Sequence, residues 1–214
     1  MLKTLPLAWR LFRREMRQRT VQIVILSLTV AVAAVSGIGF LTERVDRAVN
    51  RQASELVAAD LAVRSPHPMP AEWSEEATSR GLRSAETVEF RTVLFKGEDS
   101  QLVEVKAVDE AYPLRGTLKV ADAPFVDGVE TQSLPGHGEA WVEPRLLLSL
   151  KLKVGDQLNL GRTQVQIRKV ITHEPDRGID LIQMAPRVLV GQQTLADSAL
   201  VQPHSRVKYR KLFA

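Results

Sequence analysis

Residues 20–41, TVQIVILSLTVAVAAVSGIGFL, decide the organisation of this 214-residue chain. The segment contains no charged residue, and twelve of its residues are Val, Ile, Leu or Phe. As a helix that rises about 1.5 Å per residue it would extend roughly 33 Å, which is enough to cross a hydrocarbon core about 30 Å thick. At roughly 0.3 to 0.6 kcal/mol per residue, the twelve large side chains favour insertion by about 4 to 7 kcal/mol. We therefore expect a transmembrane helix over residues 20–41.

Two other interpretations of this segment are weighed against a membrane anchor. A fully buried helix of a soluble protein would need more protein around so long an uncharged run than this chain supplies. A cleaved signal peptide usually has an apolar run of about 7 to 15 residues, followed by a small-residue cleavage site. The small residues at 31–33 lie in the middle of the run, and residues 40–43, Phe-Leu-Thr-Glu, offer no suitable site. We favour the uncleaved anchor.

Residues 1–19 before this segment are basic and amphipathic. Thr4 can cap a helix and Pro6 suits its first turn, while one stripe would carry apolar side chains. That stripe consists of Leu5, Ala8, Trp9, Phe12 and Met16. We expect an interfacial helix on the anionic cytoplasmic leaflet, with a disordered basic tail as the alternative.

The charges on the two sides of the apolar segment predict its orientation. Residues 1–19 hold six basic residues and one acidic residue, whereas the four charged residues at 43–47 sum to zero. Because positive flanks stay in the cytoplasm, the N-terminus is expected inside and everything after residue 41 in the periplasm of a bacterium. We therefore expect the protein in the bacterial inner membrane.

The remaining chain has a composition typical of a folded domain. From residue 20 onward it carries 23 basic and 24 acidic residues, so the high overall pI comes from the N-terminal tail. A near-neutral domain lacks the basic face that nucleic-acid binding needs, and we expect no nucleic-acid partner. The absence of cysteine is compatible with a periplasmic domain without disulfides.

Periodicity after the membrane segment predicts a helical stalk followed by a mixed domain. Apolar residues recur at spacings of three and four over residues 42–58, which form the expected stalk helix. Residues 59–214 alternate short strands with short helices, and this order predicts a mixed α/β periplasmic core domain. Strands are expected near 60–63, 87–95, 101–108, 117–120, 139–142, 154–160, 164–172, 186–190 and 205–213, and helices near 72–80, 145–150 and 192–200.

Three details of the domain follow from local patterns. The strands at 87–95 and 101–108 form a hairpin across residues 96–100. Residues 112–138 are rich in Pro and Gly and predict a long surface excursion. Residues 173–180 are expected to form a polar loop.

The sequence offers little catalytic chemistry. Its four histidines are far apart in the chain, and the best cluster, His173-Glu174-Pro175-Asp176, is expected to be a solvated loop rather than a metal site. No Gly-x-Ser-x-Gly elbow, thiol nucleophile or phosphate-binding loop occurs; Gly136-His137-Gly138 lacks the Lys-Ser/Thr of a nucleotide site. We therefore assign no catalytic, cofactor-binding or metal residues, and we expect neither an enzyme nor a cofactor.

Several segments together resemble a transporter family. The basic helix, single span and stalk lead into ELVAADLAV, and WVEPRLLLSLKLKVGDQLNL and MAPRVLV follow later. This combination resembles the N-terminal portion of an ABC transporter permease of the FtsX-like/MacB-like class, most closely its YbbP-type members. The resemblance covers nearly all of the chain. Its motifs are structural rather than catalytic, since Gly155-Asp156 suits a tight turn between a helix and a strand.

The resemblance implies a mechanism. In that family a separate cytoplasmic ABC ATPase drives the permease, whose membrane helices pass the motion to a periplasmic domain that handles hydrophobic or lipid-linked cargo. Apart from the resemblance, a small-residue patch late in the span would permit close helix contact, as in a permease dimer, with ordinary small residues of a membrane helix as the alternative. The patch consists of Ala33, Ala34, Ser36, Gly37 and Gly39. A complete permease would return to the membrane, and residues 42–214 contain no second long apolar run. We therefore expect the core domain at 59–214 to be incomplete and the sequence to be a fragment.

Two other functions remain open. The first is a complete single-pass membrane protein whose periplasmic domain binds a ligand or partner. The second is a membrane-tethered periplasmic hydrolase, for which His173 and Asp176 are the visible candidates.

Overall fold

The computed structural model describes residues 18–177, 185–202 and 204–214, with the side chains of residues 46–56 excepted. The interfacial helix expected over residues 1–19 lies almost entirely outside the described residues, as do residues 178–180 of the expected polar loop. The chain forms two compact units, residues 1–51 and residues 52–214. Each unit is described by itself.

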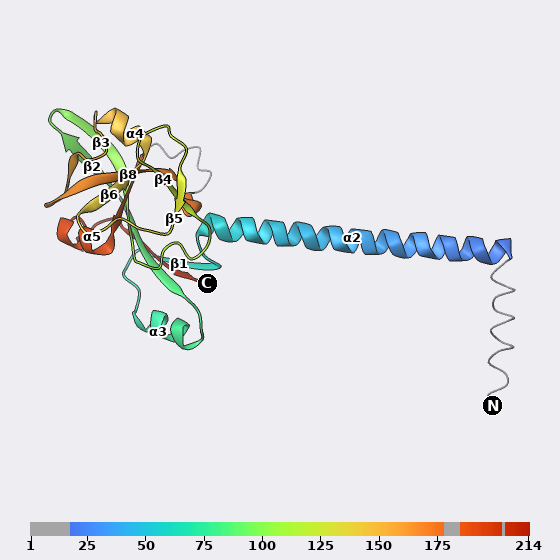
Figure 1. The fold of residues 1–214 in the computed structure, drawn as a ribbon. Coiled ribbons are helices and arrows are strands. Elements are labelled where there is room, and N and C mark those ends of the chain that lie inside the picture. Colours follow the sequence, from blue (N-terminus) through green and yellow to red (C-terminus); the bar gives the residue numbers. More distant parts are fainter. Residues whose placement is uncertain (1–17, 178–184, 203) are drawn as a thin grey trace. The chain divides into compact units, whose positions relative to one another are not determined.

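The first unit contains most of a single long helix, α2 (Arg19–Val57), shown in Figure 1. Its section Arg19–Val45 is the one described helix that is long and apolar enough to cross a membrane. The side chains of Val35, Ile38 and Phe40 are 72%, 67% and 70% exposed, so this surface needs an apolar environment. The hydroxyls of Ser27 and Thr29 donate to carbonyls one turn back, as expected for polar residues in an apolar helix.

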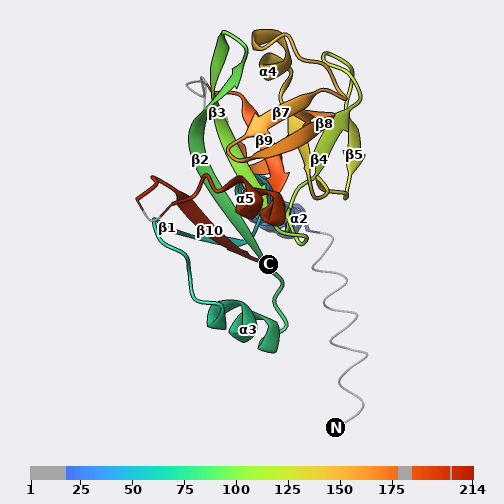
Figure 2. The ribbon, with the colours of Figure 1, turned by 90° about the vertical axis from the view of Figure 1, so that its left-hand side faces the viewer.

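The second unit is a mixed α/β domain, as the sequence predicts, and its described strands form one ten-stranded sheet. The strand order is β1-β10-β2-β3-β9-β6-β8-β4-β5, and β7 pairs with β8. The pairs β3–β9 and β6–β8 are parallel and the others are antiparallel. Figures 1 and 2 show the long paired strands β2 and β3 running through the domain. The bounds of the strands are β1 (Leu61–Ser65), β2 (Ser84–Lys96), β3 (Asp99–Val108), β4 (Leu118–Ala121), β5 (Val129–Thr131), β6 (Glu139–Val142), β7 (Gln157–Leu160), β8 (Thr163–His173), β9 (Arg187–Gly191) and β10 (Lys208–Phe213).

The described residues of the domain also form four short helical segments: α3 (Glu72–Ser79), α4 (Pro144–Ser149), the 3₁₀ turn η1 (Pro175–Arg177) and α5 (Gln192–Ser198). Helix α4 begins at Pro144, where the fixed φ of proline suits the first helical position. Its Leu146 and Leu147, with Leu150 just beyond it, are buried, so the helix packs a leucine face into the core.

The sheet has an apolar core on each face, because successive side chains of a strand point to opposite sides. One core contains Val88, Val105 and Val188 and is covered by α4, α5 and β7. The other core contains Ala85, Leu189 and Leu212 and includes the residues that follow α2. The second core carries the candidate functional site.

Two local expectations need correction. The β2–β3 hairpin closes through Gly97 and Glu98 alone, since Lys96 pairs with Asp99; glycine suits the φ of +60° at Gly97. Residues 112–138 are not only a surface excursion. Tyr112, Leu114 and Leu118 are at most 4% exposed and belong to the second core. The same segment also supplies β4 and β5, which pair at one end of the sheet.

Candidate coupling site at the end of helix α2

The last turn of α2 is fixed to the domain through its backbone. The helix ends at Val57, and Ala58 takes the left-handed conformation, with φ +60°, that commonly terminates helices. The carbonyl of Ala58 accepts hydrogen bonds from the backbone N–H groups of Leu114 and Arg115, at 3.0 and 2.9 Å. Ala58 and Ala59 are 0% and 1% exposed. The end of the helix is therefore embedded in the second core.

Two arginines fix the same turn through their side chains. Arg115 binds Asp60 with both ends of its fork, Nε to Oδ1 at 2.9 Å and Nη2 to Oδ2 at 2.6 Å. Arg210, on β10, donates from Nη2 to the carbonyl of Val57 at 3.2 Å. A cation at the C-terminal end of a helix complements the helix dipole. We call Val57, Ala58, Asp60, Leu114, Arg115 and Arg210 the α2 anchor.

Arg210 also belongs to a buried group of charges. Its Nη1 lies 2.5 Å from Asp176 Oδ2 and 3.3 Å from Glu89 Oε1. The guanidinium is 5% exposed, and the Asp176 carboxylate is fully buried. One side chain therefore joins the end of α2 to the interior of the domain.

Lys106 on β3 is the centre of this charge group. Its Nζ is 2.7 Å from Glu174 Oε1, 2.6 Å from Asp176 Oδ1 and 2.8 Å from the hydroxyl of Tyr112. Arg187 on β9 binds Glu174 from the other side, at 3.0 Å, and lies 3.3 Å from Glu104. The members of this charge cluster are Glu89, Glu104, Lys106, Glu174, Asp176, Arg187 and Arg210.

Strand alternation explains how the cluster forms. Lys106 is flanked on β3 by Val105 and Ala107, which face the first core, so Lys106 and Glu104 face the opposite side. Glu89 is opposite Lys106 in the β2–β3 register, and Arg187 is opposite Glu104 in the β3–β9 register. The turn η1 then brings Asp176 over this face, beside Glu174.

The charges hold one another in their ionised forms. Burial raises the pKa of Glu174, but the attraction of Lys106 and Arg187 outweighs it, and the net pKa falls below the ordinary value. Burial likewise raises the pKa of Asp176, but the attraction of Lys106 and Arg210 lowers it by more, so the net pKa falls below the ordinary value. Burial and the nearby carboxylates raise the pKa of Tyr112, whose hydroxyl stays protonated and donates to Asp176 at 2.5 Å.

This arrangement suits a rigid junction. Each carboxylate of the cluster lies within 4 Å of a cationic nitrogen. Removing one member of a buried ion pair typically costs about 3 to 5 kcal/mol, because its partner is left charged and desolvated. The cluster therefore resists partial opening, and the α2 anchor is attached to it through Arg210.

The structure corrects the expected solvated loop at residues 173–176. Glu174 is 4% exposed, and the carboxylate of Asp176 is fully buried, because both meet cations that lie far away in the sequence. The histidines are exposed and are not brought together; His137 pairs with Asp197, at 2.6 Å. Among the residues that the structure describes, no three His, Cys, Asp or Glu side chains are placed to hold a metal ion.

Comparison with known proteins identifies a transporter relative. No protein-family model matches the chain. The chain is 37% identical over 204 residues to the uncharacterized ABC transporter permease YbbP of Escherichia coli K12. The match covers 95% of this chain and 24% of the relative, so the chain spans about a quarter of the length of the curated relative.

Solved structures show a more distant likeness. The periplasmic region of MacB from Actinobacillus actinomycetemcomitans has a TM-score of 0.38 and 11% identity, over 61% of this chain and 57% of that one. A domain of a putative permease from Porphyromonas gingivalis has a TM-score of 0.35 and 10% identity, over 61% of this chain and 55% of that one. The similarity to an ABC transporter permease of the YbbP type, which the sequence predicts, is confirmed over nearly the whole chain.

Proposed function

We propose that this chain is the N-terminal part of an inner-membrane ABC transporter permease, in which α2 is a membrane helix that moves the domain after it. On this proposal the N-terminus is cytoplasmic and the domain is periplasmic. A separate cytoplasmic ABC ATPase supplies the energy through other parts of the permease, and the cargo is hydrophobic or lipid-linked. A permease dimer is compatible with this scheme.

The attachment of the end of α2 carries the proposal. A helix that only tethers a domain needs no fixed contacts at its exit, and a flexible linker would serve. Here the Val57 and Ala58 carbonyls are held by Arg210, Leu114 and Arg115. Displacement of this turn must displace strand β10 and the segment at residues 114–115, since the contacts join them directly. This connection supports a helix that transmits force.

The membrane orientation can be tested with single cysteines, because the chain has none of its own. Glu98 is exposed in the turn of the β2–β3 hairpin. We expect Glu98→Cys to react with a membrane-impermeant maleimide in cells whose outer membrane is permeabilised. Lys3→Cys should react only after the inner membrane is lysed, and the cysteine-free chain gives the background. The opposite labelling pattern would overturn the proposed orientation.

A further inference from the structure

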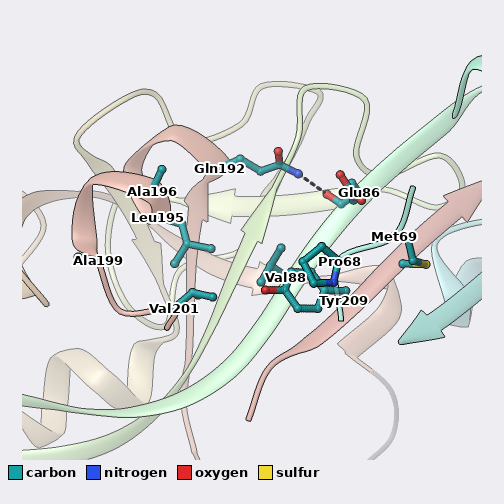
Figure 3. A pocket seen from close by; sticks show the side chains of 10 residues that line it. All are labelled: Pro68, Met69, Glu86, Val88, Gln192, Leu195, Ala196, Ala199, Val201 and Tyr209. Carbon is teal, nitrogen blue, oxygen red and sulfur yellow. Dashed lines mark hydrogen bonds between the residues drawn. The ribbon is translucent and has the colours of Figure 1, made fainter. Parts of the chain in front are cut away.

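A cavity of about 300 Å³ lies on the face of the sheet opposite the charge cluster (Figure 3). Its floor is formed by Val88 of β2 and Tyr209 of β10, which are paired in register. One wall comes from α5 and the residues after it, and the other comes from Pro68 and Met69. This volume is at the lower end of the range for small-molecule sites, so the cavity suits a small ligand.

Most of the cavity surface is apolar. Beyond the floor, Figure 3 shows the side chains of Leu195, Val201 and Met69 around the same space. The segment carrying Pro68 and Met69 is held in place by Lys211, whose Nζ donates to the carbonyl of Pro70 at 2.9 Å. The wall is therefore attached to the sheet, and an alkyl group could be buried against it.

The polar groups of the cavity are one anionic acceptor, the Glu86 carboxylate, and two groups that both donate and accept, the Gln192 amide and the Tyr209 hydroxyl. Gln192 donates its amide nitrogen to the backbone carbonyl of Glu86, at 3.1 Å, which leaves the amide oxygen as its acceptor (Figure 3). The Glu86 carboxylate is about one third exposed and lies 3.8 Å from Lys211 Nζ. Because Lys211 is 3% exposed and already donates to Pro70, it leaves part of the carboxylate accessible. A ligand here meets an apolar surface beside the Gln192 amide, the Tyr209 hydroxyl and the anionic Glu86 carboxylate.

We propose that this cavity binds a small amphipathic amine. Its alkyl part would lie against Val88, Leu195 and Tyr209, and its ammonium would donate to Glu86 and to the amide oxygen of Gln192. A carboxylate ligand of the same length would face the Glu86 charge, and an alcohol would donate only one neutral hydrogen bond. The site is separate from the α2 anchor, because Tyr209 and Lys211 point to the opposite side of β10 from Arg210.

Methyl NMR of the full chain in lipid nanodiscs tests this proposal. Met69 lines the cavity and is one of four methionines, so its methyl resonance can be assigned by a Met69→Leu variant. n-Hexylamine, n-hexanol and hexanoate are titrated in parallel, with free concentrations measured to correct for partition into lipid. We expect saturable shifts of the Met69 methyl with hexylamine, at least fivefold weaker binding of hexanol, and no saturable shift with hexanoate.

Two matched variants separate the cavity from the rest of α5. Ala196 and Gln193 are both exposed on α5, but only Ala196 lines the cavity. Ala196→Phe should weaken hexylamine binding at least tenfold, whereas Gln193→Phe should leave it unchanged. Glu86→Gln should weaken hexylamine about fivefold and leave hexanol unaltered. Equal binding of the three probes, or equal effects of the two phenylalanine variants, would overturn the proposal.

Discussion

Replacement of Arg210 by methionine tests the coupling between α2 and the domain. Methionine keeps the apolar length of the side chain and removes the guanidinium, which is 5% exposed and contacts Asp176, Glu89 and the Val57 carbonyl. Loss of one partner from a buried ion pair costs about 3 to 5 kcal/mol. Domains typically have a total stability of about 5 to 15 kcal/mol, so we expect the variant to fold with much reduced stability.

Urea unfolding of the full chain in nanodiscs measures this loss. Trp141 is 2% exposed in the second core, and its fluorescence reports unfolding of the domain. With a urea dependence of about 2 kcal/mol per molar, a loss of about 3 to 5 kcal/mol lowers the midpoint by about 1.5 to 2.5 M. Arg210→Lys should lose less, since lysine keeps the charge but has no planar fork to reach two partners.

Arg64→Met is the matched control. Arg64 lies directly opposite Arg210 in the β1–β10 register and is exposed. Exposed substitutions of this kind usually change stability by no more than about 0.5 kcal/mol. If Arg210→Met were as mild as Arg64→Met, the charge cluster would not be holding the end of α2, and the reasoning would be wrong.

Three further predictions concern the interior. The pKa values of Glu174 and Asp176 are lowered, so these carboxylates stabilise the folded state when the pH is above their ordinary pKa values of 4.5 and 3.8, and the urea midpoint should fall as the pH drops below about 4.5. Asp109, whose pKa burial raises, changes in the opposite sense, so two carboxylates with lowered pKa values act against this one. A midpoint independent of pH between 7 and 3 would contradict the ionised cluster. Lys106→Met removes the cation that Glu174 and Asp176 share, and should move the acid unfolding midpoint to higher pH, measured by the same fluorescence; Lys119→Met, at an exposed surface pair, should not. Gly161→Ala should lower the free energy of unfolding by about 3 kcal/mol, because the added Cβ would lie 2.2 Å from the Ser198 carbonyl oxygen, at a φ of +62°. Gly97 has a similar φ of +60° but lies in open space, so Gly97→Ala should cost about 1 kcal/mol. Similar midpoints for these two alanine variants would rule out the close approach at Gly161.

Local patterns were sufficient to predict much of the fold. Alternating residues and a glycine turn predict the β2–β3 hairpin, and Pro144 with its following leucines predicts α4. The apolar run predicts the long section of α2, because charge-free length is itself the signal. In each case the residues that decide the structure are close together in the sequence.

The candidate site could not be predicted in this way. Lys106 is 68 residues from Glu174 and 70 residues from Asp176, so the composition around His173 indicated only a polar loop. Lys106 lies between Val105 and Ala107, and this alternation of apolar and polar residues is typical of a strand with one solvated face, so it gave no sign that Lys106 is buried. The burial of Tyr112 and Leu114 was hidden similarly, because neighbouring Pro and Gly residues indicated a surface segment.

Native-state amide hydrogen exchange at Leu114 and Arg115 tests the attachment of α2 most directly. Both amides donate to the carbonyl of Ala58, at the end of the helix. We predict that in nanodiscs they exchange with the same opening free energy as the amides of β10, and that Arg210→Met lowers their protection by at least tenfold and by no less than it lowers the protection of β6 and β9. If these two amides exchanged rapidly in the unaltered protein, and Arg210→Met did not change their exchange rates, the end of α2 would be loose. That result would contradict a force-transmitting helix.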